Sequence, residues 1–129
     1  MKLNPTRKSI DQLLIERRRG WILKTLDEAR PGAVELAVLS LALDELNMPM
    51  GSRTLASELD YLRSLKLIRV FMQGETRDLT DVEQALLMQR YADSEPGSEY
   101  RLNMCARIAV TGVDFQQGLC TFDGITRVE

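Results

Sequence analysis

The stretch Ser52–Met72, SRTLASELDYLRSLKLIRVFM, constrains the fold of this chain more than any other. It opens with a serine that can cap a helix, and leucines follow at the spacing of one buried helical face. Those leucines are Leu55, Leu59, Leu62 and Leu65. The run Leu67–Met72 then changes to apolar, β-branched and aromatic residues typical of a strand. A helix that leads directly into a strand predicts further helices before it and a partner strand after it.

Two helices are predicted before this stretch. Ser9 can cap the first, whose apolar stripe is interrupted at residues 17–20; one helix is expected, irregular at Gly20. Proline and glycine at positions 31 and 32 end it. The second helix is apolar at most positions, so we expect it to be buried on most sides. The predicted elements are helices near 9–29, 33–47 and 52–66, followed by strands near 67–73 and 100–108.

A long segment, residues 74–98, separates the two predicted strands. Thr80 and Glu83 have the spacing of a capping box, and an amphipathic helix is predicted from about 81 to 91. Because a helix of this length is marginal alone in water, its apolar face must pack on the domain or on another chain. The sequence leaves both alternatives open.

The second strand would return beside the first as an antiparallel hairpin, and Thr111 can cap a short helix through Gln117. We therefore predict an α+β, mainly α fold in a single domain, residues 1–129. It is a winged helix-turn-helix of three helices and a two-stranded antiparallel hairpin, with a helical insertion in the wing. Residues 111–129 form a C-terminal helix and tail. The residues predicted to be buried are Leu39, Leu43, Leu55, Leu59, Leu62 and Ile68.

Composition excludes several classes of function. The chain of 129 residues is 44% apolar, yet it has no signal-peptide pattern and no apolar run that could span a membrane. We expect a soluble cytoplasmic protein. With no histidine, the usual zinc sites and Ser-His or Cys-His catalysis cannot form, and Cys105 and Cys120 are expected to be free thiols. We predict no enzyme activity, metal, cofactor or small-molecule substrate, and interpret acidic pairs such as Asp44-Glu45 as surface charges.

Charge is distributed unevenly along the chain. Residues 1–69 hold 12 Lys and Arg against 9 Asp and Glu, whereas residues 70–129 hold 5 against 10. This asymmetry indicates either two faces with different partners or ordinary solvated charge. Arg17, Arg18 and Arg19 are the densest positive group. They could contact DNA phosphates, or they could form a solvated face paired with Glu16.

A double-stranded DNA partner is the first functional hypothesis. The predicted third helix would enter the major groove, with Arg53 able to reach a base edge or a phosphate. The full set of predicted DNA contacts is Arg17, Arg18, Arg19, Arg53, Thr54, Ser57, Tyr61 and Ser64. The alternative is a winged-helix protein-protein interaction module that does not bind DNA.

Three runs carry a resemblance to a known family. They are LLIERRRGWILKTLDEARPGAVE, SRTLASELDYLRSLKLIRV, and the segment from Ile108 through VTGVDFQQG to FDGITRVE. In pattern, residues 10–72 and 100–127 resemble the winged-helix proteins of Mu-like phages and prophages, whose fold is described as ArsR-like. The resemblance implies a phage-encoded transcriptional regulator or DNA-associated factor. Residues 74–98 depart from the pattern, because the wing of that family is short.

A homodimer is also predicted, because winged helices commonly bind two half-sites through two-fold symmetry. The inserted helix and the first helix offer more apolar surface than one small core requires. Leu86 and Tyr91 are the predicted dimer-interface residues.

Overall fold

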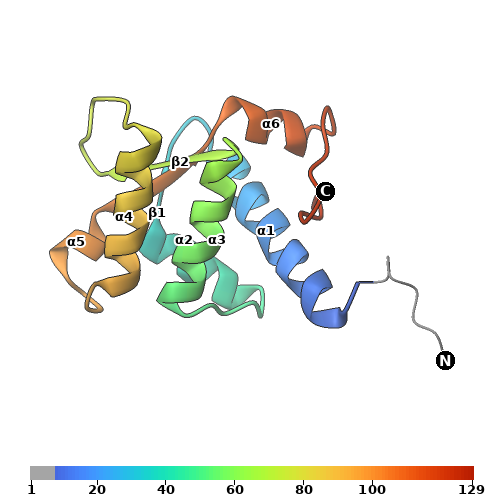
Figure 1. Cartoon of the computed structure of the whole chain (residues 1–129), viewed down its shortest axis with the longest axis horizontal. Coiled ribbons are helices and arrows are strands. Elements are labelled where there is room, and N and C mark those ends of the chain that lie inside the picture. Colours follow the sequence, from blue (N-terminus) through green and yellow to red (C-terminus); the bar gives the residue numbers. More distant parts are fainter. Residues whose placement is uncertain (1–7) are drawn as a thin grey trace.

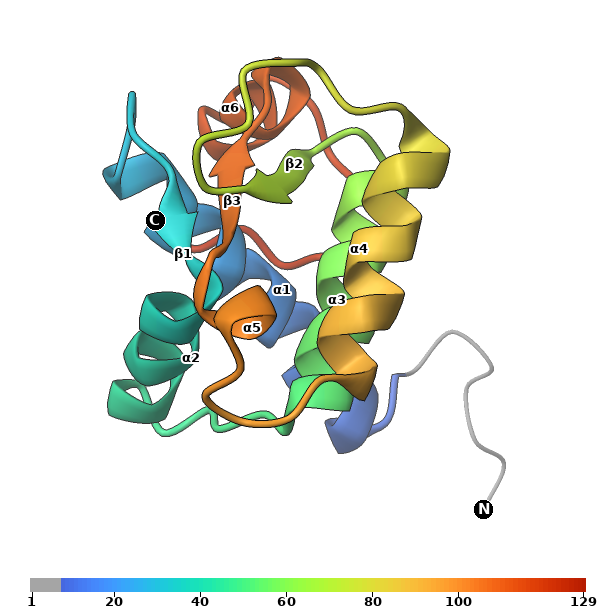
Figure 2. The same ribbon diagram turned by 90° about the vertical axis from the view of Figure 1, so that its left-hand side faces the viewer.

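The computed structural model describes residues 8–129, which form a mainly helical α+β fold with a three-stranded antiparallel sheet (Figure 1). The elements follow one another as α1 (Ile10–Glu28), β1 (Val34–Glu35), α2 (Leu36–Glu45), α3 (Ser52–Ser64), β2 (Ile68–Met72), α4 (Asp81–Asp93), α5 (Glu99–Leu102), β3 (Met104–Ile108) and α6 (Val110–Gln116). Helices α4 and α3 lie side by side, and α1 lies between them and α2 (Figure 2). Within residues 8–129, no helix is long and apolar enough to cross a membrane.

The core confirms the helical register predicted for α3. All six residues predicted to be buried are at most 1% exposed, and they form one cluster with apolar side chains of α1, β2 and β3. The start of α3 differs in one respect. Gly51 is its N-cap, so Ser52 is the first helical residue and makes no side-chain capping bond.

β3 lies at the centre of the sheet, between β1 and β2. Ala106 is in register with Val70 on one side and with Val34 on the other. The sequence predicted a helix from residue 33, and this was wrong for the first three residues. Val34–Glu35 is extended because it pairs with the free edge of β3, and α2 begins only at Leu36.

The first helix is capped by Ser9 as predicted, since the Ser9 hydroxyl accepts from the backbone N–H of Gln12 at 3.1 Å. The predicted irregularity at Gly20 is absent, and α1 is continuous. Gly20 has a different role. The C-terminal segment passes so close that a Cβ at Gly20 would lie 1.8 Å from the carbonyl oxygen of Thr126. The absence of a side chain therefore allows the chain end to pack on α1.

The strand predicted over 100–108 is shorter than expected. The Ser98 hydroxyl caps a helical turn, α5, by accepting from the backbone N–H of Arg101, and β3 starts only at Met104. Local capping thus outweighs the alternating pattern that suggested an extended chain from residue 100. The predicted cap at Thr111 was also wrong, because α6 begins at Val110 with Ala109 as its N-cap.

The inserted helix is confirmed as α4, two residues longer than predicted, with both bonds of the Thr80–Glu83 capping box. It runs antiparallel to α3, directly beside it (Figure 2). Its buried amide, Gln84, accepts from the backbone N–H of Val70 at 3.0 Å and donates to the carbonyl of Leu79 at 3.2 Å. Of the two alternatives left open, packing on the domain itself is the one observed.

Candidate nucleic-acid interface

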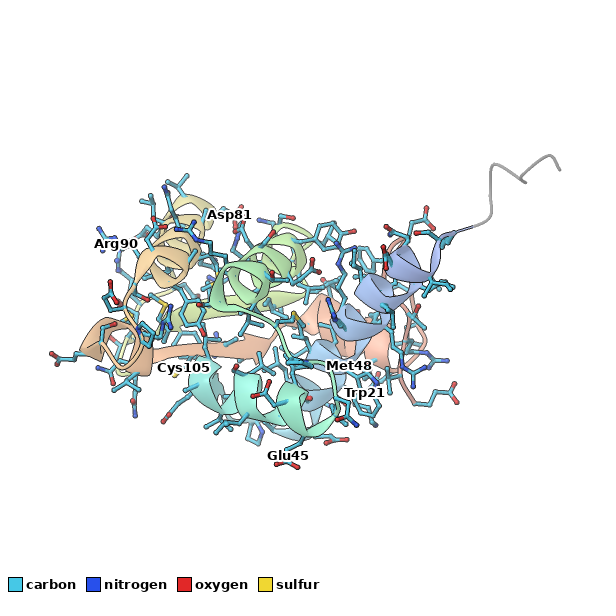
Figure 3. The ribbon with its side chains drawn as sticks, turned by 90° about the horizontal axis from the view of Figure 1, so that it is seen from below. Trp21, Glu45, Met48, Asp81, Arg90 and Cys105 are labelled. Carbon is cyan, nitrogen blue, oxygen red and sulfur yellow. The ribbon has the colours of Figure 1, made fainter. Side chains whose placement is uncertain are left out.

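The surface of α3 that faces away from the core is a polar stripe, open except where Arg19 of α1 contacts Tyr61 and Glu58. Thr54, Ser57 and Ser64 are exposed on it. Leu55, Leu59 and Leu62 occupy the opposite, buried face, which fixes the direction in which the polar side chains point. Helices α4 and α1 flank the stripe on its two sides (Figures 1 and 3). A partner would therefore meet α3 as the middle of three helices.

Arg53 stands at the first turn of α3, where its side chain is 80% exposed. It forms an ion pair with Asp93, at the end of α4, with a separation of 3.4 Å. Between the two helices lies a shallow groove of about 410 Å³. Because exposed ion pairs contribute little and are screened by salt, Asp93 leaves this arginine free to exchange partners.

Two of the predicted DNA contacts are engaged within the domain instead. The Arg19 guanidinium pairs with Glu58, donates to the carbonyl of Gly124 at 2.9 Å, and lies 3.9 Å from the ring centroid of Tyr61. The Tyr61 hydroxyl donates to the carbonyl of Asp123 at 3.3 Å. These contacts hold α1, α3 and the C-terminal segment together. Arg19 and Tyr61 thus form a structural junction rather than an open surface.

Arg17 and Arg18 differ from Arg19. Arg17 is exposed, Arg18 is half-exposed, and neither has an ion-pair partner among residues 8–129. Glu16, the partner considered from sequence, is buried and pairs with Lys8. The hydrogen bond from Lys8 holds the pKa of the Glu16 carboxyl below its ordinary value. Two of the three consecutive arginines therefore remain available to a partner.

Ion pairs link the C-terminal end of α3 to the start of α4. Lys66 pairs with Asp81, and the buried Arg63 lies 2.8 Å from Asp60 and 3.9 Å from Asp81. The hydrogen bond from Lys66 lowers the pKa of the Asp81 carboxyl. Figure 3 shows Asp81 at the start of α4. Since Arg53 and Asp93 pair at the other end, ion pairs link the two helices at both ends.

A second basic group lies on the outer face of the sheet, where the sequence predicted no site. Arg69 of β2 and Arg107 of β3 are directly opposite each other in the strand register. They share the rim of a pocket of about 470 Å³ with Arg30 and Lys66. Both arginines lie at outward positions of the predicted hairpin. Aligning its two strands would have placed them together, although no local motif marks either one.

The two predicted dimer-interface residues have different environments. Leu86 is 48% exposed on the outer side of α4, next to the exposed Val82. Tyr91 is only 4% exposed, packs in the domain's own core, and has a pKa raised by burial. Tyr91 is therefore covered within the domain, and Leu86 remains available to a second chain.

The described residues hold two free thiols and no cluster of metal ligands. No three His, Cys, Asp or Glu side chains in residues 8–129 gather in a way that could hold a metal ion. Cys105 and Cys120 are free thiols, as predicted. Cys105 is buried on β3, and burial, with a smaller effect of Glu35, raises the pKa of its thiol. A raised pKa lowers the fraction of reactive thiolate at neutral pH.

Comparisons with known proteins give no relative for this chain. No protein-family model, no curated protein and no solved structure matches it. The resemblance to winged-helix proteins of Mu-like phages therefore stays a prediction based on the runs quoted above.

Proposed function

We propose that this chain is a winged helix-turn-helix protein that binds double-stranded DNA, as a phage- or prophage-encoded transcriptional regulator or DNA-associated factor. The topology supports the fold. A helix, a short strand, two helices and two strands follow in order, and the last strand lies between the other two. The inserted α4 lengthens the wing without interrupting that order. The single observation that carries the function is the open polar stripe of α3.

The geometry supports a specific mode of docking. The major groove is about 12 Å wide and admits one helix, so α3 and α4 cannot both enter it. With α3 against the groove, Thr54, Ser57 and Ser64 would face base edges. Arg53 and the two available α1 arginines would face phosphates. We expect phosphate contacts to provide most of the affinity.

Mutation and salt dependence test this mode. Substituting both Arg17 and Arg18 with Gln should weaken binding to every duplex and reduce the slope of log K against log salt by about 2. Arg53→Ala should cost about 1–3 kcal/mol on a preferred site and less on random DNA if the arginine reads a base. Fluorescence anisotropy with labelled duplexes measures both.

Arg127→Gln provides a matched control, because it removes one arginine that pairs with Glu129 on the C-terminal segment. It should leave binding unchanged. Absence of binding by the unsubstituted protein at about 50 mM salt, where phosphate contacts are strongest, would refute the DNA function.

A protein-protein interaction module is the second candidate, and exposed apolar side chains favour it. Ile10, Leu13 and Leu14 are 46–77% exposed on α1, and Val82 and Leu86 are exposed on α4. Such side chains are common singly, but groups on one helix face mark contact surfaces. If duplex binding is absent, Leu86→Glu becomes the first substitution to test in an interaction assay with the full chain. A homodimer through the same surfaces is part of this proposal.

A further inference from the structure

Two arginines lie directly opposite each other on the outer face of the sheet, with an anion near both of them. Arg69 and Arg107 are cross-strand partners, and like charges directly opposite each other destabilise a strand pair. In this structure the anion is the carboxylate of Asp78, from the loop before α4. Its Oδ1 lies 3.9 Å from Nη2 of Arg69 and 3.8 Å from Nη2 of Arg107.

Asp78 holds this position loosely. Its side chain is 86% exposed, and both distances exceed the 2.7–3.2 Å range of an N–H···O hydrogen bond. Arg69 also donates to the carbonyl of Leu79 at 2.8 Å, so it anchors the loop. Arg107 is half-exposed, and among residues 8–129 its contacts are Asp78 and the ring of Phe71, whose centroid is 5.7 Å away. The hydrogen-bond donors of Arg107 are therefore available to a stronger acceptor.

Two pockets lie beside these arginines. One is also lined by Asp78 and Glu75, and the other, of about 470 Å³, is lined by basic and uncharged residues and by no acidic residue. Arg30 and Lys66 contribute its other two basic side chains, and the remaining lining comes from residues 31–32 and 108–111. The carboxylates that pair with Arg30 and Lys66, those of Asp27 and Asp81, lie outside the lining. The four cations come from three separate parts of the sequence, because Lys66 and Arg69 are near neighbours, and only the folded chain brings all of them together.

We propose that this pocket binds phosphate groups of a nucleic-acid backbone, and that Asp78 is an internal counter-ion which the incoming phosphate displaces from between Arg69 and Arg107. The proposal rests on the proposed DNA function and extends the duplex contact from α3 to the outer face of the sheet. A phosphodiester offers charged oxygens that match the donor geometry of a guanidinium better than a carboxylate held at 3.8 Å.

Two substitutions with opposite expected effects test the pocket. Arg107→Gln should weaken binding of a mixed-sequence duplex about three- to tenfold at about 100 mM salt and reduce the salt slope by about 1. Asp78→Asn should tighten binding about two- to fivefold, because it removes the competing charge. Neither residue is buried, and circular dichroism with thermal unfolding checks that each variant folds. Arg127→Gln is the control for Arg107→Gln, because it makes the same charge change outside the pocket.

The outcomes separate this proposal from the function on which it rests. Unchanged binding in both variants, with weaker binding in the Arg17→Gln, Arg18→Gln double variant, overturns the pocket and leaves the DNA function standing. Absence of duplex binding by the unsubstituted protein at about 50 mM salt overturns both. Titration with inorganic phosphate, followed by NMR of the arginine Nε–H groups, distinguishes the source of the phosphate. If inorganic phosphate shifts the arginine Nε–H signals only when Arg107 is present, and no duplex binds, the assignment of the pocket to nucleic acid is overturned.

Discussion

Gly20 is a position inside a helix where glycine should be more stable than alanine, although alanine has the higher helix propensity. In an exposed helix interior, replacing glycine by alanine stabilises by about 1 kcal/mol. At Gly20 the new Cβ would meet the carbonyl oxygen of Thr126 at 1.8 Å, and backbone atoms cannot move aside easily. We predict that Gly20→Ala lowers the free energy of unfolding by about 1–3 kcal/mol, as overpacking does. Urea unfolding measures the change.

Gly51→Ala is the control for that substitution, because a Cβ at Gly51 would meet no atom within 4 Å. It should change the free energy of unfolding by less than about 1 kcal/mol. A stabilised Gly20→Ala variant would show that the C-terminal segment does not pack on α1 as described.

Leu59 is the residue on which the register of α3 depends. It is fully buried, so Leu59→Ala should cost about 2–5 kcal/mol through lost burial and the cavity left behind. Leu86→Ala makes the same chemical change at a half-exposed position of α4 and should cost much less. Equal losses in the two variants would contradict the buried register of α3. Chemical denaturation provides both values.

Two helix caps that depend on neighbours in sequence were predictable, although the caps predicted at Ser52 and Thr111 were wrong. Residues with distant partners were not predictable. Ser9 and Thr80 cap helices through atoms three residues away, so local spacing was sufficient. Arg19 was predicted to contact DNA, yet its partners Glu58 and Gly124 lie 39 and 105 residues away in the chain. No local sequence pattern indicates a contact between residues so far apart in the chain.

Among the elements, α4 depends on its capping box, and this gives a pH dependence. The pKa of Glu83 lies below its ordinary value of 4.5, first because the backbone N–H of Thr80 donates to its carboxylate and then because of Arg77. A carboxyl whose pKa is lower when folded stabilises the fold above its unfolded pKa. That stabilisation is lost as the pH falls through the folded value. Glu83→Gln should therefore flatten the fall in thermal stability below about pH 4.5.

Thermal unfolding monitored between about pH 3 and 7 tests this expectation. Glu45→Gln is the matched control, since it removes an exposed carboxylate of α2 without affecting the box. A pH profile that is unchanged by Glu83→Gln would show that the box contributes no charge-dependent stability.

The long elements were predictable because each carries its own period, whereas the short ones depend on the rest of the fold. β1 has only two residues, Val34 and Glu35, too few to show alternation, and its conformation is set by pairing with β3. Ser98 caps α5, a helical turn that overlaps the start of the strand predicted over residues 100–108. The sheet therefore has one more strand than the sequence indicated, and β3 lies between its two neighbours.

For the whole molecule, we predict self-association through the outer face of α1. The exposed side chains of Ile10, Leu13 and Leu14 share that face, while Tyr91, one of the two residues predicted for the interface, is enclosed in the core. Light scattering at about 50 µM should give the mass of a homodimer, the commonest oligomer with two-fold symmetry. Leu14→Glu should return it to a monomer. Leu86→Glu tests α4 in the same way, and a monomeric unsubstituted protein would contradict the prediction.

One basic cluster at this scale combines both halves of the sequence. Arg107 from the acidic second half joins Arg30, Lys66 and Arg69 from the basic first half. The strand register places Arg69 opposite Arg107. That register is known only once both strands have been paired.

The bond between Gln84 and β2 gives the insertion a second consequence. β2 is an edge strand, and Gln84 satisfies one of its outward N–H groups while α4 covers that side. Uncovered strand edges recruit other chains by backbone pairing. Deleting residues 74–98 would therefore yield an aggregation-prone protein rather than a smaller version of the same domain. A shortened loop would need another group to shield the edge of β2, whichever partner the protein binds.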